Sequence, residues 1–214
     1  MSTAVILVAA LLVQAPPAGR NSWEQAYAKG TAESFAAQFE EPSRALFRYR
    51  QAIAGLMQIK PGMMVGEVGA GSGYLSRFIA EKVGADGRVL ANELEPKMVE
   101  YMTARAVKEG LKNFRAVTGT PVSTGFDAGS IDAIAAVYSF SFFDQPAEML
   151  KSMNESLKPN GLLLIVDSPR EGLTASSPGM DADEVVALAT AGGFNRVIEN
   201  GVVPGHYAII FRKK

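Results

Sequence analysis

The stretch that decides the fold runs from Val65 to Ala80 and reads VGEVGAGSGYLSRFIA. It opens inside an apolar run, Met63–Val68, that is typical of a buried strand. Glycines at alternate positions follow, and apolar residues then recur at helical spacing over 75–83. Because glycine permits positive φ angles and a close approach of the backbone to a ligand, we predict a strand, a tight glycine loop and a helix, in that order.

Outward from this stretch, the chain alternates helix and strand patterns. Apolar residues recur at helical spacing over 46–56, 96–109 and 146–157, and short apolar runs typical of strands lie at 88–92, 114–117, 131–138 and 162–166. Continuous apolar runs indicate strands that are covered on both faces, so the alternation predicts an α/β fold with a doubly wound, mostly parallel sheet. The last two strand patterns, 196–203 and 206–211, have only Pro204-Gly205 between them, which predicts a hairpin and an antiparallel strand at the sheet edge.

Local signals mark where some of these elements begin and end. Lys158–Gly161 predicts a turn before the fifth strand. Asp181 and Glu184, three residues apart, predict a capping box at the start of a helix. Gly192 with the glycine after it is expected to end that helix.

The composition excludes several kinds of chemistry. The chain has 214 residues, enough for one domain with a sizeable core. Lysine plus arginine number 21 and aspartate plus glutamate 22, so the chain lacks the basic excess of a non-specific nucleic-acid binder. Having no cysteine and a single histidine, it has no thiolate nucleophile and no histidine-cluster metal site. We therefore expect neither a metal nor a nucleic-acid partner, and the oligomeric state is left open.

The N-terminus carries an unbroken apolar run, AVILVAALLV, from Ala4 to Val13. It is too short for a transmembrane helix, which needs about 20 residues, but it suits a secretory signal with small residues near Ala15 and Ala18. No lysine or arginine precedes the run, so a short helix packed on the domain in a cytoplasmic protein is the alternative to export or anchoring. We divide the chain into a signal-like segment, an N-terminal extension and a main domain: 1–18, 19–41 and 42–214.

Two carboxylates flank the glycine loop, Gly69–Gly73. Glu67 lies just before it, and Glu93 lies at the end of the second strand pattern. Ligands of doubly wound sheets bind at the carboxyl ends of the strands, where a carboxylate such as Glu93 can accept both hydroxyls of a ribose. The dinucleotide fingerprint G-x-G-x-x-G does not fit, because its third glycine position holds Tyr74. A pyrophosphate does not call for the acid at Glu67, whereas the cationic amino-acid end of S-adenosylmethionine does.

These residues resemble the class I S-adenosylmethionine-dependent methyltransferases. The matching segments are VGEVGAGSGYLSRFIA (65–80), ANELEP (91–96), SIDAIAAVYSF (130–140), LKPNGLLLIVD (157–167) and the closing GGF…HYAIIF hairpin. The resemblance covers about 42–211, most of the chain. It implies a Rossmann-like, seven-stranded, mostly parallel sheet with a C-terminal antiparallel hairpin, S-adenosylmethionine as the cofactor, and methyl transfer as the activity.

The resemblance also implies a role for each matching residue. The residues that line the methionine part of the cofactor would be Glu67, Gly69, Ala70, Gly71 and Gly73. Glu93 would hold the ribose, and Leu94 would pack on the adenine. Thr120 stands near the place where the family often has an acid for the adenine amino group. Val137 and Tyr138, at the end of the fourth strand, would face the sulfur.

Methyl transfer from a sulfonium is a direct displacement, which needs an in-line nucleophile in a site shielded from water. The sequence offers no obvious general base near the site. The lone histidine, His206, lies in the terminal hairpin and is expected to be structural, and Asp132 is expected to organise the turn into the fourth strand. We therefore expect catalysis by proximity and orientation, with catalytic residues unassigned. The aromatic candidates for lining the pocket are Tyr138, Phe140, Phe142 and Phe143.

The sequence does not identify the methyl acceptor, and we expect a small molecule. Its choice should depend on the extension, the exit of the fourth strand and the loop 168–180, in which Arg170 is a candidate for an anionic group. One alternative is a domain that binds S-adenosylmethionine or S-adenosylhomocysteine without catalysis. A second is a protein isoaspartyl O-methyltransferase, which EVGAGSGYL also resembles, although the segment after the fourth strand differs. The lack of cysteine disfavours the arsenic-type methyltransferases.

Overall fold

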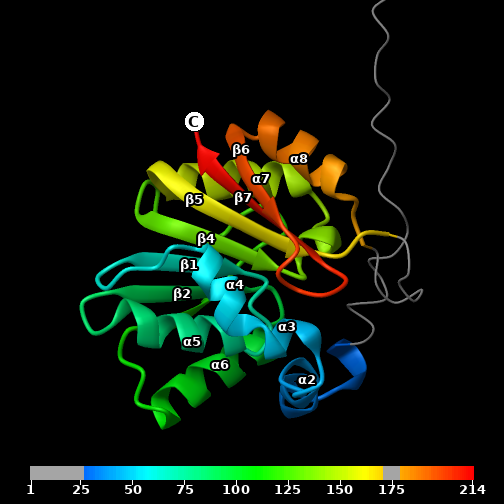
Figure 1. The fold of residues 1–214 in the computed structure, drawn as a ribbon. Coiled ribbons are helices and arrows are strands. Elements are labelled where there is room, and N and C mark those ends of the chain that lie inside the picture. The colour runs from blue at the N-terminus through cyan, green and yellow to red at the C-terminus, as the bar shows by residue number, and fades with distance from the viewer. Residues whose placement is uncertain (1–26, 171–178) are drawn as a thin grey trace, which may run out of the picture.

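The computed structural model describes residues 27–170 and 179–214, so the signal-like run at 4–13 and part of the loop 168–180 lie outside the described residues. One seven-stranded sheet has the strand order β3-β2-β1-β4-β5-β7-β6 (Figure 1). The strands are β1 (Met64–Val68), β2 (Arg88–Glu93), β3 (Phe114–Thr118), β4 (Ile131–Val137), β5 (Leu157–Asp167), β6 (Phe194–Asn200) and β7 (Tyr207–Lys213). The helices are α2 (Ala32–Phe39), α3 (Ala45–Arg48), α4 (Arg50–Leu56), α5 (Tyr74–Val83), α6 (Pro96–Lys108), the 3-10 helix η1 (Phe140–Phe142), α7 (Pro146–Ser156) and α8 (Ala182–Ala191).

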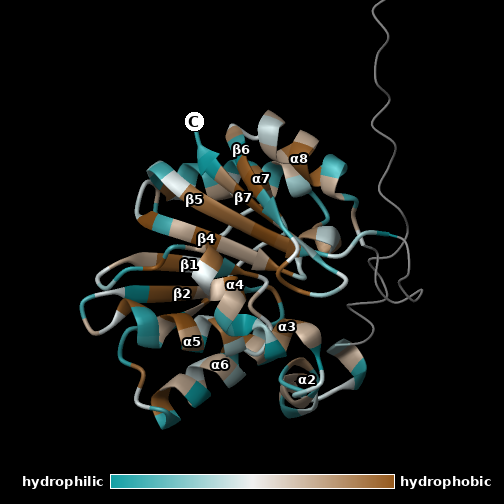
Figure 2. Ribbon diagram, in the orientation of Figure 1, coloured by the Kyte–Doolittle hydropathy of each residue, from teal (hydrophilic) through white to brown (hydrophobic). Residues whose placement is uncertain are grey.

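Helices cover both faces of the sheet and bury a core on each. On one face, Ile53 of α4 and Ile79 of α5 share a buried cluster with Val65 of β1. On the other face, Met153 of α7 belongs to a cluster with Ile134 of β4. Figure 2 shows hydrophobic residues concentrated on the central strands. Burial on both faces explains the continuous apolar runs, and the predicted doubly wound α/β fold is confirmed.

The predicted antiparallel hairpin closes the sheet, but the strand that runs against the parallel ones, β7, lies one place inside the edge. β7 runs between β5 and β6 and pairs antiparallel with both. Its residues Ile209, Ile210 and Phe211 are buried, whereas most of β6 is exposed. A strand that buries successive residues needs cover on both faces, so the apolar β7 takes the inner place and the polar β6 takes the edge.

β5 begins earlier than predicted, because it includes Lys158–Gly161, where the sequence indicates a turn. The pairing of β5 with β4 shifts register between Leu157 and Leu162. Within the irregular stretch, Asn160 has a φ of +60°. The turn-forming residues therefore produce an irregularity inside the strand, much as a bulge does, and do not end it.

Asp132 binds the strands on either side of β4 and not the turn before β4, which it was expected to organise. Its Oδ2 accepts a hydrogen bond from the backbone N–H of Met64 at 2.8 Å, and its Oδ1 pairs with Nζ of Lys158 at 2.7 Å. The carboxylate thereby ties the start of β1 and the irregular part of β5 to β4.

The predicted capping box at α8 is wrong, although the helix begins and ends where expected. Asp181 is the N-cap residue, but its side chain makes no capping bond. Both carboxylates bind Arg170 instead. The backbone N–H of Arg170 donates to Asp181 at 3.2 Å, and its guanidinium pairs with Glu184 at 2.6 Å. A capping box does occur at the start of α2, between Thr31 and Ser34, where serine replaces the usual glutamate or glutamine.

The described part of the N-terminal extension, from Tyr27 on, packs against α6. Phe35 shares a buried cluster with Met98 of α6, and Nζ of Lys97 donates to the carbonyl of Gly30 at 3.0 Å. Further along, the helix predicted over 46–56 is divided into α3 and α4 at Tyr49. Over 27–170 and 179–214, every helix is too short or too polar to cross a bilayer.

Candidate functional site

The glycine loop joins β1 to α5 at the carboxyl end of the sheet. Gly69, Gly71 and Gly73 have φ angles of +76°, +56° and +71°, a conformation that side chains disfavour. The N–H of Gly69 donates to the carbonyl of Asn92, at the end of β2, at 3.0 Å. A Cβ atom on Gly69 would lie 2.5 Å from Cβ of Ser139, which follows β4. Glycine is therefore required where the loop passes between the ends of β2 and β4.

Glu93 is the last residue of β2, and its carboxylate is hydrogen-bonded to the middle of this loop. Its Oε2 accepts the N–H of Gly71 at 2.8 Å, and its Oε1 accepts the N–H groups of Leu94 at 2.7 Å and Glu95 at 3.2 Å. The side chain is buried, and burial raises its pKa, while the backbone hydrogen bonds act in the opposite direction. The loop and the acid that the sequence predicts to share a site are in direct contact.

Glu67 lies within β1, just before the loop, and is 2% exposed. Its carboxyl group accepts a hydrogen bond from Oγ of Ser76 on α5. Burial raises the pKa of Glu67 to about 8, and the bond from Ser76 only partly offsets this. A cationic group brought beside Glu67 would favour its ionised form, so this position suits the positively charged end of a ligand.

Two further observations at the loop fit a ligand with a polar and a flat apolar part. Ser72 is fully buried, yet its Oγ has no hydrogen-bond partner among the described residues. Buried polar atoms are normally paired, so an unpaired hydroxyl marks a place for a ligand group. Leu94, next to Glu93, is apolar and leaves 48% of its surface exposed.

The exit of β4, residues 137–139, lies against the glycine loop and forms the other side of the candidate site. Val137 is buried, and Tyr138 has a φ of +53°, unusual for a residue other than glycine. Two hydrogen bonds hold this geometry: the N–H of Tyr138 donates to the carbonyl of Val166 at 2.7 Å, and Oγ of Ser139 donates to the carbonyl of Val68 at 2.8 Å. Backbone strain of this kind often occurs at functional sites, where it aims a side chain.

His206 lies against Tyr138, so the expectation that no histidine is near the site is wrong. The ring centroids are 5.7 Å apart, in an edge-to-face arrangement. Nδ1 of His206 lies 2.9 Å from the carbonyl oxygen of Pro204. The reason is topological: an antiparallel β7 begins at the end of the sheet where the parallel strands finish. The loop before β7 therefore returns to the site.

Thr120, the candidate for the adenine side of the cofactor, lies just after β3. The N–H of the preceding Gly119 donates to the carbonyl of Glu93 at 3.0 Å, which places the end of β3 beside the end of β2. The side chain of Thr120 is exposed, and its Oγ1 accepts the N–H of Val122 at 3.4 Å. Its described contacts stay within its own turn.

The sequence predictions missed two residues that cover the loop from the N-terminal side, Phe39 and Arg44. The ring of Phe39 lies 3.1 Å from where a Cβ on Gly71 would stand. The guanidinium carbon of Arg44 is 5.6, 5.8 and 5.7 Å from the ring centres of Phe39, Tyr74 and Tyr138. Arginine over aromatic faces is a favourable arrangement that short sequence patterns do not reveal, because the rings come from separate elements.

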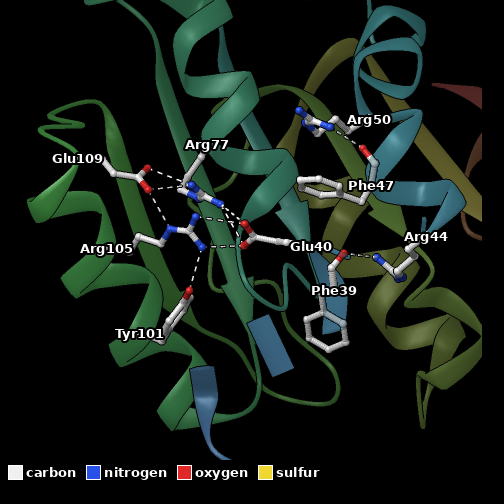
Figure 3. Close-up of polar contacts among 9 residues, drawn as sticks. All are labelled: Phe39, Glu40, Arg44, Phe47, Arg50, Arg77, Tyr101, Arg105 and Glu109. Atoms are coloured by element: carbon white, nitrogen blue, oxygen red, sulfur yellow. Dashed lines mark hydrogen bonds and ion pairs between the residues drawn. The ribbon is translucent and has the colours of Figure 1, made fainter. Parts of the chain in front are cut away.

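An ion-pair network, which we call the Glu40 clamp, anchors this covering segment (Figure 3). Glu40 follows α2 and pairs with Arg77 of α5 at 3.0 Å and with Arg105 of α6 at 2.7 Å. Both arginines also bind Glu109, and Arg105 donates to the hydroxyl of Tyr101 at 2.8 Å. The clamp joins the end of α2 to two helices of the main domain.

The sequence is similar to known methyltransferases. Residues 65–161 match a family described as "Methyltransferase domain". The ubiquinone/menaquinone biosynthesis C-methyltransferase UbiE of Legionella pneumophila (strain Corby) is 31% identical over 52% of this chain and 45% of that protein. Protein-L-isoaspartate O-methyltransferase of Pyrococcus horikoshii is 37% identical over 51% of this chain and 46% of that protein. The chain thus spans about half the length of the curated relatives it matches.

Solved structures show the same fold. A SAM-dependent methyltransferase from Aquifex aeolicus superposes with a TM-score of 0.77 at 22% identity, over 87% of this chain and all of that one. Geranyl diphosphate methyltransferase in complex with SAM gives 0.64 at 14% identity, over 81% of this chain and 93% of that one. Residues 65–161 are thus similar to a methyltransferase domain, and the chain has the fold of methyltransferases that use S-adenosylmethionine.

Proposed function

We propose that this protein transfers a methyl group from S-adenosylmethionine to a small-molecule acceptor. The observation that carries the proposal is the contact between Glu93 and the N–H of Gly71, which holds a carboxylate over a glycine loop at the carboxyl end of β1. In a doubly wound sheet, this is where a nucleoside ligand binds. Glu67, buried beside the loop, adds a site for a positive charge.

The proposed cofactor contacts follow the order of the elements. Glu67 and the loop residues Gly69, Ala70, Gly71 and Gly73 hold the methionine part. Glu93 accepts the ribose hydroxyls, Leu94 covers the adenine, and Thr120 lies on the adenine side. Val137 and Tyr138, at the exit of β4, lie nearest to the sulfur.

Catalysis in this proposal rests on binding and orientation. The cofactor supplies an electrophilic methyl group on a sulfonium, which a positioned nucleophile attacks directly. Tyr138, Phe142 and His206 form an aromatic wall at the exit of β4, with ring separations of 6.0 and 5.7 Å from Tyr138. Such a wall excludes water from the reacting atoms and offers π-faces to a cation.

The relatives differ in what their names say they methylate, so they do not name the acceptor. A quinone-pathway C-methyltransferase and an isoaspartate O-methyltransferase both match this chain. Two alternatives to the small-molecule reaction are a domain that binds the cofactor without catalysis and an isoaspartyl methyltransferase.

Calorimetric titration of the full chain with S-adenosylmethionine, S-adenosylhomocysteine and NADH tests the cofactor. We expect micromolar binding of the two sulfur compounds and none of NADH. Absence of sulfur-cofactor binding would overturn the proposal. Methyl-labelled S-adenosylmethionine is then supplied with small-molecule acceptors and, separately, with an isoaspartyl peptide. Binding without label transfer to any acceptor favours the non-catalytic alternative.

A further inference from the structure

Arg44 stands among three aromatic rings that belong to three separate parts of the site. Phe39 ends α2, Tyr74 begins α5, and Tyr138 follows β4. The guanidinium carbon lies 5.6 to 5.8 Å from each ring centre, and Nη1 donates to the carbonyl of Phe39 at 3.1 Å. The rings fix the position of a cation at the point where the covering segment, the glycine loop and the exit of β4 meet.

The charge of Arg44 is not matched by a carboxylate in the ion pairs of the described residues. Arg77 and Arg105 share Glu40 and Glu109, and Arg170 pairs with Glu184. Arg44 has aromatic faces, the backbone carbonyl of Phe39 and the hydroxyl of Tyr74 as its described neighbours. A half-buried guanidinium with such neighbours keeps its capacity to bind an anion.

Its surroundings indicate which anion fits. Phe39 contacts the position of Gly71, and Tyr74 directly follows the last glycine of the loop. In the proposed function, the methionine part of the cofactor lies along this loop and carries one ammonium and one carboxylate. Glu67 offers a place for the ammonium. The guanidinium of Arg44, which lies near Tyr74 at the start of α5, offers a counter-charge for the carboxylate.

We propose that Arg44 binds the α-carboxylate of the cofactor's methionine part, a role that rests on the proposed function. The planar guanidinium is suited to a carboxylate because it donates two parallel hydrogen bonds. Its placement depends on the Glu40 clamp, since Glu40 lies between Phe39 and Arg44 and is bound to α5 and α6. The N-terminal segment outside the matched region 65–161 thus completes the cofactor site.

The test compares two ligands that differ only at this carboxylate: S-adenosylmethionine and its decarboxylated analogue. Affinities are measured by calorimetry on the full chain and on the Arg44→Gln variant. We expect Arg44→Gln to weaken S-adenosylmethionine about tenfold or more, as loss of a charge-assisted pair does, and to leave the analogue unchanged. Arg50→Gln is the matched control. Arg50 also covers a ring and donates to its carbonyl, at 4.3 and 2.8 Å from Phe47, and its loss should leave both affinities unchanged (Figure 3).

The outcomes separate this role from the proposed function. If the unmodified protein binds neither ligand, both fail. If it binds both and Arg44→Gln weakens both equally, or weakens neither, the carboxylate role is overturned while the cofactor assignment stands. Arg44→Lys covers the case in which Arg44→Gln does not fold. Because it keeps the charge but not the planar fork, it should lose part of the preference for S-adenosylmethionine over the analogue, and a fully retained preference would overturn the role.

Discussion

At the scale of single residues, the two carboxyl groups beside the glycine loop have different surroundings. Glu93 accepts three backbone N–H groups, an arrangement that favours an ionised carboxylate, while burial raises its pKa. Glu67 has only the bond from Ser76 against a larger effect of burial, so its pKa rises to about 8 and it holds a proton at neutral pH. The carboxylate of Glu93 is therefore arranged to accept hydrogen bonds, whereas a nearby positive charge would change the protonation of Glu67.

Replacing Glu93 by alanine should weaken S-adenosylmethionine binding by at least about tenfold. The change removes an acceptor for two charge-assisted hydrogen bonds to the ribose and also releases the N–H of Gly71. Calorimetry checks this, with Glu95→Ala as control, because Glu95 is the same residue type two positions later and its side chain makes no capping bond. An unchanged affinity in Glu93→Ala would exclude the ribose role.

Binding of S-adenosylmethionine near pH 7.5 should release protons. In the free protein, Glu67 titrates with a pKa of about 8 and is largely protonated below it. A cation placed beside the group lowers this pKa, so ligand binding expels the proton. Calorimetry in buffers of different ionisation enthalpy measures the release, which should decline as the pH rises well above 8. Equal release in Glu67→Gln would assign the proton to another group.

At the scale of elements, α2 depends on its contacts with the main domain, and the Glu40 clamp is one of them. It has eight residues, and isolated helices of that size are not stable in water. Its packing on α6 involves a small cluster around Phe35 and Met98. The clamp joins it to α5 and α6, the helices that flank the glycine loop. We therefore expect loss of the clamp to disturb the glycine loop as well as α2.

Glu40→Gln should loosen α2 while the main domain keeps its fold. The change leaves Arg77 and Arg105 with Glu109 but removes the partly buried carboxylate that both share, at a cost of about 1–3 kcal/mol. Hydrogen–deuterium exchange should rise over 32–39 and stay unchanged in β4 and β5. Glu41→Gln serves as control, because that residue is exposed and its side chain is hydrogen-bonded to the neighbouring Ser43 and takes no part in the clamp. Equal exchange in both variants would show that the clamp does not hold the helix.

At the scale of the whole molecule, the elements marked by local sequence patterns were predictable. The contacts between residues far apart in the sequence were not. The strands β1 to β5, the glycine loop and its contact with Glu93 follow from apolar runs and from the geometry of parallel strands. The inner position of β7 and the approach of His206 to Tyr138 depend on which strand the closing hairpin joins. Nor does any short pattern indicate that Arg44 meets rings from three elements.

The single histidine makes this long-range closure measurable in solution. Because the chain has one histidine, its imidazole gives one set of NMR signals, and they report on the ring that lies against Tyr138. Addition of S-adenosylhomocysteine should shift these signals if Tyr138 faces the sulfur, and the shift should shrink in Tyr138→Leu. Calorimetry on the same samples establishes that the ligand is bound. Saturated binding with unmoved imidazole signals would place the cofactor away from the exit of β4, and the aromatic wall would then belong to the acceptor side alone.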